Sequence, residues 1–290
     1  MGSVVDGRAE VAATHEVLRI DDLDVMVHRS GEGNEQCIVF LHGGGPGATG
    51  WSNWQFALPA LGDRFQCLAP DFVGYGDSSH PDPAPTDMRD WSRMRLRQVL
   101  GMLDAFGIEH ATLVGNSLGG ALSLHLLADH PERFDRAVLM GTAGGPSSRN
   151  PTHELVRMIT FYDDPSEEAL ARLYSWFVYD AERFGSELVT IARNRYELTM
   201  RPEVRRSYQA QFSGPSHLAL PDTALRRIQH PVLLVHGLQD AINPLDDSLH
   251  FLRLLPNAEL FVFPRCGHWT QIEYPEKFHN LVSAFVSGDL

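Results

Sequence analysis

The chain has few cysteines and few basic residues for its length. Cys37, Cys67 and Cys266 are the 3 cysteines in 290 residues. A sparse and odd set excludes a disulfide framework or a cysteine-based zinc site and favours a reducing compartment. Lysine and arginine total 24 against 37 aspartates and glutamates, which gives a net charge of −13. Phosphate backbones and anionic lipids repel such a chain, so nucleic acid and membrane surfaces are not expected as partners.

Long hydrophobic runs are also absent. The strongest apolar segments, "CIVFL" and "PVLLV", have the length of a strand and not of a membrane span. The first residues, "MGSVVDGRAEVAATHE", are too polar for a signal peptide, and Asp6 disagrees with a myristoylation pattern. We therefore expect a cytoplasmic protein of a size typical of enzymes.

Short apolar runs alternate with amphipathic stretches in the first half of the chain and again near its end. This alternation indicates a mostly parallel central sheet with helices on both faces. The runs predict strands over 37–42, 66–71, 111–116, 136–141, 231–237 and 258–264. The amphipathic stretches predict helices over 51–61, 94–107, 117–131, 246–255 and from Pro275.

Residues 144–220 interrupt this alternation. They contain no convincing strand but several stretches with helical spacing, such as "SEEALARLYSWFVYD" and "ELVTIARNRYELTM". An insertion of this kind is expected to cover the carboxyl ends of the strands, where open sheets bind ligands. The chain is thus divided into a core at 1–143, a helical cap at 144–220 and a second core segment at 221–290.

A serine between glycines stands where a predicted strand meets a predicted helix. The segment "LVGNSLGGA" places Ser117 in a Gly-x-Ser-x-Gly pattern. In that context a strained turn exposes the serine hydroxyl, and the glycines remove side chains that would clash with the turn. The pattern alone is common, so its meaning depends on whether the rest of the chain supplies a base and an acid.

Both partners follow late strands in the order that the chemistry requires. Asp240 comes directly after the strand at 231–237, and His268 directly after the strand near Phe263. A serine needs a base to become a nucleophile, and the base needs an acid to orient it. The order Ser, Asp, His predicts a Ser117–His268–Asp240 triad on an α/β-hydrolase fold with a helical cap insertion. His42 and His236 are assigned to local packing or hydrogen bonding.

A glycine-rich loop after an early strand completes the predicted site. The segment "LHGGGPGATGWSN" leaves backbone N–H groups uncovered, as stabilisation of an oxyanion requires. The amides of Gly44 and Leu118 are the candidate oxyanion hole. The alternative, a phosphate-binding loop, is disfavoured because no Lys-Ser/Thr pair follows the glycines.

Several segments resemble the meta-cleavage product hydrolases, which cut a carbon–carbon bond in ring-opened catechols. The resemblance covers nearly the whole chain and rests on "HGGGPGA" with "WSNW", "LVGNSLGGA", "LMGTAGG", "FVYD", "ARNRYELTMRPE", "INPLDDSL" and "CGHWTQIE". It implies hydrolysis of the C5–C6 bond of a 2-hydroxy-6-oxohexa-2,4-dienoate with an alkyl or aryl group at C6. The products would be 2-hydroxypenta-2,4-dienoate and a carboxylic acid.

The same resemblance implies roles for residues around the triad. Arg195 would bind the substrate carboxylate, with Asn53, Asn116 and Trp269 as further polar contacts. The alternative for Arg195 is a solvated charge, and Asn116 has a competing task in bracing the serine turn. Phe177 would lie under the apolar face of the cap beside the C6 substituent. The other candidates there are Phe161, Val178, Leu155, Met158 and Ile242.

Some points remain open at this stage. A carboxylesterase or a lactonase could use the same triad, and attack by Ser117 is not distinguished from attack by an activated water. No metal or organic cofactor is expected, because no ligand cluster is seen. A homo-oligomer, dimeric or of higher even order, is implied by the resemblance alone.

Overall fold

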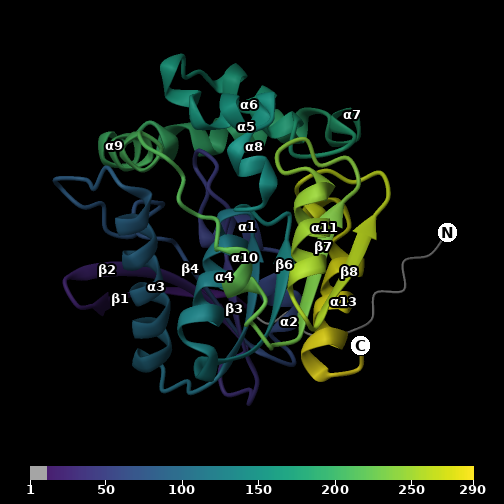
Figure 1. Cartoon of the computed structure of the whole chain (residues 1–290). Coiled ribbons are helices and arrows are strands. Elements are labelled where there is room, and N and C mark those ends of the chain that lie inside the picture. The colour runs from purple at the N-terminus through teal and green to yellow at the C-terminus, as the bar shows by residue number, and fades with distance from the viewer. Residues whose placement is uncertain (1–11) are drawn as a thin grey trace.

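The computed structural model describes residues 12–290 of the chain. Their centre is an eight-stranded sheet with the order β1-β2-β4-β3-β5-β6-β7-β8. Figure 1 shows the sheet with helices packed around it and a group of helices above one end of the strands. Residues 1–11, which include most of the segment judged unsuitable as a signal peptide, lie outside the described residues.

Six strands confirm the prediction and run parallel to one another. They are β3 (Cys37–Leu41), β4 (Gln66–Pro70), β5 (Ala111–Asn116), β6 (Phe134–Met140), β7 (Val232–Gly237) and β8 (Ala258–Phe263). Two antiparallel strands, β1 (Thr14–Ile20) and β2 (Leu23–Ser30), were not predicted. Most residues of β1 are exposed, so this edge strand lacks the buried apolar run that identifies the others.

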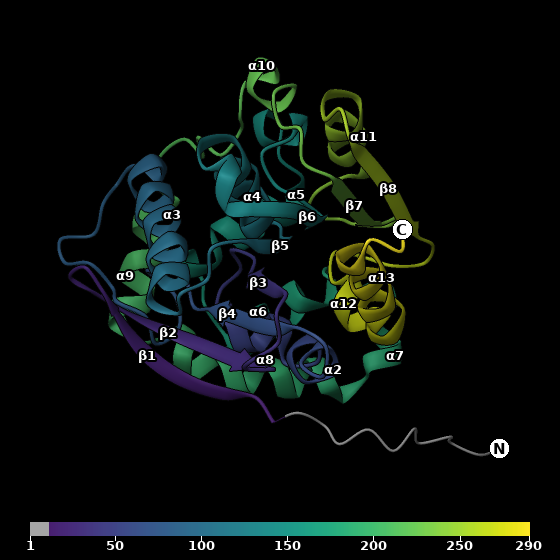
Figure 2. The ribbon, with the colours of Figure 1, turned by 90° about the horizontal axis from the view of Figure 1, so that it is seen from below.

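Helices cover both faces of the sheet, as predicted. Figure 2 shows α3 (Met88–Ala105), α4 (Leu118–Asp129) and α11 (Leu245–Leu254) on one face, and α2 (Ala57–Leu61) and α13 (Pro275–Ser287) on the other. The short helices are α1 (Gly50–Trp54), α10 (Asp222–Leu225) and α12 (Thr270–Glu273), with 3₁₀ turns at Pro131–Arg133, Pro146–Arg149 and Phe161–Asp163.

Two helix predictions had wrong bounds. The stretch 51–61 forms α1 and α2 in place of one helix. Helix α3 begins at Met88 because the side chain of Asp87 caps its first turn by accepting the N–H of Arg89.

Alternate residues of the central strands serve two separate cores. In β3, Val39 and Leu41 pack in the cluster that contains α3 and α4, whereas Ile38 and Phe40 pack in the cluster that contains α2 and α13. Because both faces are buried, the strand reads as a continuous apolar run in the sequence. The two cores hold the carboxyl ends of β5, β6 and β7 in a fixed row, and the predicted site residues follow these ends.

A helical insertion between β6 and β7 lies above that row of strand ends (Figure 1). It comprises α5 (His153–Ile159), α6 (Glu167–Ser175), α7 (Ala181–Phe184), α8 (Ser186–Thr199) and α9 (Pro202–Gln211). The division of the chain at residues 143 and 220 stays a prediction. In residues 12–290, no helix is long and apolar enough to cross a membrane.

Candidate active site

Ser117 lies on a sharp turn between β5 and α4. Its backbone has φ 52° and ψ −109°, a combination that costs energy for any residue with a side chain. The flanking glycines cannot be replaced without collision. A Cβ on Gly119 would lie 2.2 Å from the Leu41 carbonyl oxygen, and one on Gly115 would lie 2.5 Å from the Gly119 carbonyl oxygen. The turn thus holds the serine at the end of the sheet.

Asp240 and His268 form a buried pair beside this turn. Asp240 Oδ2 lies 2.6 Å from His268 Nδ1, and Asp240 Oδ1 accepts the backbone N–H groups of Ile242 and Asn243 at 2.8 and 3.0 Å. A carboxylate can only accept here, so Nδ1 carries the proton and Nε2 of His268 is the acceptor nitrogen. The pair matches the acid–base part of the predicted triad.

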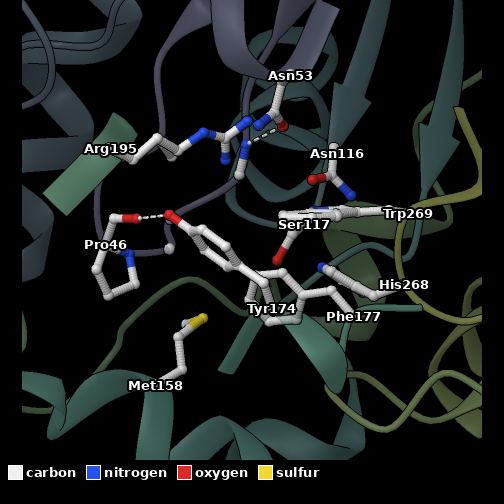
Figure 3. A pocket seen from close by; sticks show the side chains of 14 residues that line it. Pro46, Asn53, Asn116, Ser117, Met158, Tyr174, Phe177, Arg195, His268 and Trp269 are labelled. Carbon is white, nitrogen blue, oxygen red and sulfur yellow. Dashed lines mark hydrogen bonds between the residues drawn. The ribbon is translucent and has the colours of Figure 1, made fainter. Parts of the chain in front are cut away.

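Ser117 and His268 line the same pocket, and Figure 3 shows the hydroxyl and the ring side by side in it. In the described chain no hydrogen bond joins them. Ser117 Oγ instead accepts a long bond of 3.4 Å from Asn243 Nδ2. Hydrogen bonds between catalytic groups are often loose in structures without substrate and tighten when it binds.

Two backbone amides adjoin Ser117 with their N–H groups uncommitted. Gly44 lies in the glycine loop, and Leu118 begins α4. Neither N–H donates a hydrogen bond to another residue between 12 and 290. A Cβ on Gly44 would lie 3.4 Å from Leu118 Cδ2, so the two positions are neighbours. Tyr75 fixes the loop by donating its hydroxyl to the Gly44 carbonyl at 3.0 Å.

Arg195, from α8, is a cation at the edge of this pocket. Its Nη2 donates to the Ser52 carbonyl at 3.0 Å, and its guanidinium carbon lies 5.3 and 5.7 Å from the ring centres of Tyr174 and Trp269. Within the described residues it makes no ion pair. Stacking on aromatic faces holds the planar group in place, while its charge stays available to an anion.

Three further predicted residues line the same pocket (Figure 3). Asn53 Oδ1 accepts the Gly43 N–H at 3.1 Å, and Asn116 Nδ2 donates to the Met140 carbonyl at 3.2 Å. Both amides therefore brace the loops of the site, which supports the expected structural task of Asn116. Phe177 packs with its ring centre 4.7 Å from that of Trp269 and 5.6 Å from that of His268.

We call the space lined by Ser117, His268, Arg195, Asn53 and Trp269 the polar pocket. It holds about 20 Å³, which is room for a water molecule. A second space, the apolar cavity, also reaches Ser117 and holds about 270 Å³. Its lining residues include Leu118, Ala143, Leu155, Met158, Ile159, Phe212, Leu218 and Asn243. Gly44, Ser117 and Met158 line both spaces.

Leu155 and Met158 line the apolar cavity, and Met158 also lines the polar pocket. Phe177 lines the polar pocket beside Ser117. Their expected contacts with a C6 substituent stay predictions. The α6–α7 link carries Phe177 back towards the His268 loop. Phe161, Val178 and Ile242 line neither space and are buried among other side chains.

Hydrogen bonds from backbone N–H groups join the insertion to the loop that carries His268. We call this group of hydrogen bonds the seam. The Trp269 N–H donates to the Phe177 carbonyl at 3.0 Å. The carboxylate of Glu273 accepts the Tyr179 N–H at 2.9 Å and the Gly267 N–H at 2.6 Å. Burial raises the pKa of Glu273. The loop that carries His268 is therefore held in place by contacts with both the insertion and the core.

Residues 36–275 match the family of the alpha/beta hydrolase fold. The 2-hydroxymuconate semialdehyde hydrolase of Pseudomonas sp. strain CF600 is 38% identical over 90% of this chain and 89% of its own. The crystal structure of the 2-hydroxy-6-oxo-6-phenylhexa-2,4-dienoate hydrolase from Rhodococcus sp. strain RHA1 superimposes with a TM-score of 0.89 at 39% identity, covering 94% of this chain and 98% of the other. The structure of a meta-cleavage product hydrolase from Pseudomonas fluorescens superimposes with a TM-score of 0.85 at 32% identity, and the match covers 97% of this chain and 99% of the other.

The chain belongs to the meta-cleavage product hydrolases of the α/β-hydrolase family. It is accordingly a hydrolase of carbon–carbon bonds in the breakdown of aromatic compounds, and its substrate is a small molecule.

Two other buried histidines of this meta-cleavage product hydrolase are committed to the scaffold. His42 contacts the Gly43 carbonyl and the Phe72 N–H, and burial lowers its pKa to about 4. His236 contacts Ser248 and the Asn243 carbonyl, and its pKa is also lowered by burial. In the described part of the chain no group of three or more His, Cys, Asp or Glu residues could hold a metal ion.

Several residues of the site were not predicted from the sequence. Tyr75, Tyr174 and Asn243 each contact a predicted site residue. Glu273 accepts the N–H of Gly267, which precedes His268, and Gly141 lies where a side chain would meet His268 and Asp240. For Asn243 a signal existed, because it stands three places after Asp240 on the same loop. No local pattern in the sequence indicates the other four residues, because their contacts arise from the tertiary structure.

Proposed function

We propose that this hydrolase cleaves the C5–C6 bond of a 2-hydroxy-6-oxohexa-2,4-dienoate that carries an alkyl or aryl group at C6. The observation that carries the proposal is the convergence of three groups on one pocket. Ser117, His268, which is held by Asp240, and the Arg195 cation, which has no ion-pair partner among residues 12–290, all line it. An esterase needs the first two, but a cation at this position suits a substrate that is itself an anion.

The catalytic roles follow from the geometry. Asp240 holds His268 with Nε2 as the acceptor, and His268 takes a proton from Ser117 or from a water molecule that attacks C6. The amides of Gly44 and Leu118 stabilise the oxyanion that forms at the C6 carbonyl. Since their N–H groups have no partner, they need no reorganisation when the charge develops.

Fission of the C5–C6 bond requires that C5 can leave with the electron pair as a stabilised carbanion. Ketonisation of the dienol moves a proton to C5 and creates the electron sink for the later step. After attack at C6, the C5–C6 bond breaks and the electron pair flows into the 2-oxo system. With one water consumed, the products are 2-hydroxypenta-2,4-dienoate and a carboxylic acid.

We place the two ends of the substrate in the two spaces that share Ser117. The carboxylate binds Arg195 in the polar pocket in place of the Ser52 carbonyl, with Asn53, Asn116 and Trp269 beside it. The C6 substituent occupies the apolar cavity, whose 270 Å³ exceeds the roughly 150 Å³ of an apolar cavity that accepts benzene.

The relatives do not fix the substituent. One is named for 2-hydroxymuconate semialdehyde and another for a 6-phenyl dienoate, and this chain is 38% and 39% identical to them. The size of the apolar cavity is therefore the main argument that an aryl group is accepted.

The test is an absorbance panel of dienoates with methyl, isopropyl and phenyl groups at C6. Meta-cleavage products are yellow, and we expect the enzyme to bleach them with turnover and release one carboxylic acid per molecule. The rival is a carboxylesterase or lactonase with the same triad. Hydrolysis of nitrophenyl esters or lactones without bleaching of any dienoate would favour that rival.

The assembly also remains a prediction. We expect a homodimer or a higher even oligomer, and light scattering of the purified chain measures this directly.

A further inference from the structure

A buried set of hydrogen bonds connects helix α9 of the insertion to the glycine loop of the site. Arg95 Nη2, from α3, donates to Oε1 of Gln211 at 2.8 Å, and Gln211 is the last residue of α9. The hydroxyl oxygen of Tyr75 lies 3.2 Å from the same Oε1 and 3.0 Å from the Gly44 carbonyl oxygen. The side chains of Arg95, Gln211 and Tyr75 are buried. These contacts thus end on Gly44, whose N–H is one of the two proposed donors to the oxyanion.

The orientation of the Gln211 amide follows from the charge of Arg95. Burial lowers the pKa of Arg95 to about 10, so the guanidinium stays protonated near neutral pH and can only donate hydrogen bonds. The Gln211 atom that faces it must therefore be the carbonyl oxygen Oε1. A charged donor makes a stronger hydrogen bond than a neutral hydroxyl does, so Arg95 satisfies this oxygen in preference to Tyr75.

The Tyr75 hydroxyl has one hydrogen and two acceptor oxygens within reach. Burial raises the pKa of Tyr75 to about 12, so the hydroxyl keeps its hydrogen at neutral pH. The Gly44 carbonyl accepts a hydrogen bond from no other residue in the described part of the chain. Because Arg95 already donates to Gln211 Oε1, the hydrogen of Tyr75 is directed to Gly44.

Both peptide groups that meet at Gly44 are held by side chains. His42 Nε2 accepts the Phe72 N–H at 2.9 Å, so Nδ1 carries the hydrogen and donates to the Gly43 carbonyl at 2.7 Å. That carbonyl and the Gly44 N–H belong to one peptide group. Tyr75 holds the next peptide group by the Gly44 carbonyl. Glycine has more freedom in φ and ψ than other residues, so the direction of the Gly44 N–H depends on both contacts.

This arrangement leaves two buried donors unpaired. Arg95 Nη1 and Gln211 Nε2 have no hydrogen-bond partner among residues 12–290, and unpaired buried donors cost free energy. A carboxylate in place of the amide would neutralise the cation, but it would also draw the Tyr75 hydrogen away from Gly44. The neutral amide holds Arg95 and leaves that hydrogen to the glycine loop.

We propose that Gln211 is a positioning residue for the oxyanion hole: it holds Arg95 through a neutral oxygen and thereby leaves the hydrogen of Tyr75 to the Gly44 carbonyl. The inference rests on the proposed function, in which the Gly44 N–H stabilises the oxyanion. Gln211 lines neither the polar pocket nor the apolar cavity. It acts through Tyr75, so a helix of the insertion helps to set a donor that belongs to the core.

The experiment is the substitution Gln211→Glu, which keeps the size of the side chain and an oxygen that faces Arg95. The carboxylate is a stronger acceptor than the Gly44 carbonyl and takes the Tyr75 hydrogen. We expect kcat for dienoate cleavage to fall about 3- to 10-fold, the range of one neutral hydrogen bond. KM should change little because Arg195 is not disturbed. Stability in urea should not fall, since the buried cation gains a counter-ion.

Gln209→Glu is the matched control. It makes the same change of charge on the same helix at an exposed position, so kcat should stay that of wild type. Tyr75→Phe removes the donor itself and should lower kcat as much as Gln211→Glu does. The double variant of Tyr75 and Gln211 should be no slower than either single variant, because both substitutions remove one and the same contact.

The outcomes separate this inference from the proposed function. If dienoates are bleached but kcat is unchanged in Gln211→Glu, falls equally in Gln209→Glu, or falls additively in the double variant, the role of Gln211 is overturned and the reaction stands. If wild type bleaches no dienoate, the proposed function fails, and nitrophenyl acetate serves for the same comparison because its hydrolysis also forms an oxyanion. Hydrolysis of neither substrate would overturn both proposals.

Tyr75→Phe also covers the case in which Gln211→Glu does not fold. A folded Tyr75→Phe enzyme with the kcat of wild type would show that the Gly44 carbonyl needs no donor, and the inference would then be wrong. A kcat lowered about 3- to 10-fold at unchanged KM would support it.

Discussion

Replacement of Gly141 by alanine tests the placement of the Asp240–His268 pair without mutating either residue. Gly141 follows β6, has φ +49°, and its carbonyl accepts Asn243 Nδ2. A Cβ at this position would lie 2.9 Å from His268 Nδ1 and 3.0 Å from Asp240 Oδ2. Ordinary contacts of a Cβ begin near 3.4 Å, so the pair must move by several tenths of an ångström.

Two costs are expected from Gly141→Ala. An alanine at positive φ loses about 1–2 kcal/mol of stability. Displacement of the imidazole lowers kcat by about 10- to 100-fold, since misplacement of a catalytic group by 1 Å can cost about 100-fold. KM is expected to change little, because the Arg195 end of the polar pocket is not disturbed.

Gly107→Ala is the matched control. Gly107 has a similar φ of +66°, but a Cβ there would meet nothing within 4 Å. It therefore carries the backbone cost alone. The assay combines urea unfolding with dienoate bleaching for both variants. A Gly141→Ala enzyme that loses stability like Gly107→Ala but keeps the kcat of wild type would refute the assigned position of the pair.

Three further predictions use other parts of the molecule. Ser117→Ala should abolish turnover by orders of magnitude while a dienoate still binds, as seen by its absorbance shift; retained turnover would remove the serine from the mechanism. Arg195→Ala should lower kcat/KM about 10- to 100-fold through loss of a charge-assisted contact, whereas Arg193→Ala, which removes an exposed arginine paired with Glu167, should not. Burial lowers the pKa of His42 to about 4 in the folded protein, so the unfolded chain binds a proton at this residue more readily than the folded chain does. The free energy of unfolding should therefore fall as the pH drops from about 6.5 to 4. In the His42→Gln variant this dependence on pH should be weaker.

The parts of the fold that are buried on both sides were predictable from the sequence. Strands β3 to β7 read as apolar runs because helices cover both faces, whereas in the edge strand β8 only Phe263 is buried. The insertion lacks such runs. The β1–β2 hairpin escaped prediction because its exposed edge strand has no distinctive pattern. The length of α3 depended on a cap at Asp87, which is a local signal that hydrophobic spacing does not contain.

The site divides in the same way. Ser117, Asp240 and His268 could be located because each follows a strand in a fixed order, so topology brings them to one edge. Gly141 could not, since its importance lies in distances of about 3 Å to loops that are far away in the sequence. Asn243 stands close to Asp240, but its contact with Ser117 is a feature of the tertiary structure. The spacing of Phe177 places it on the insertion, but only the structure shows that its side chain lines the polar pocket.

The seam couples the insertion to the catalytic imidazole. The Trp269 N–H donates to the Phe177 carbonyl, and Glu273 accepts the N–H groups of Tyr179 and Gly267. A displacement of the α6–α7 link is therefore transmitted to the loop that carries His268. A substitution in this part of the insertion can change the reaction rate without contacting the substrate.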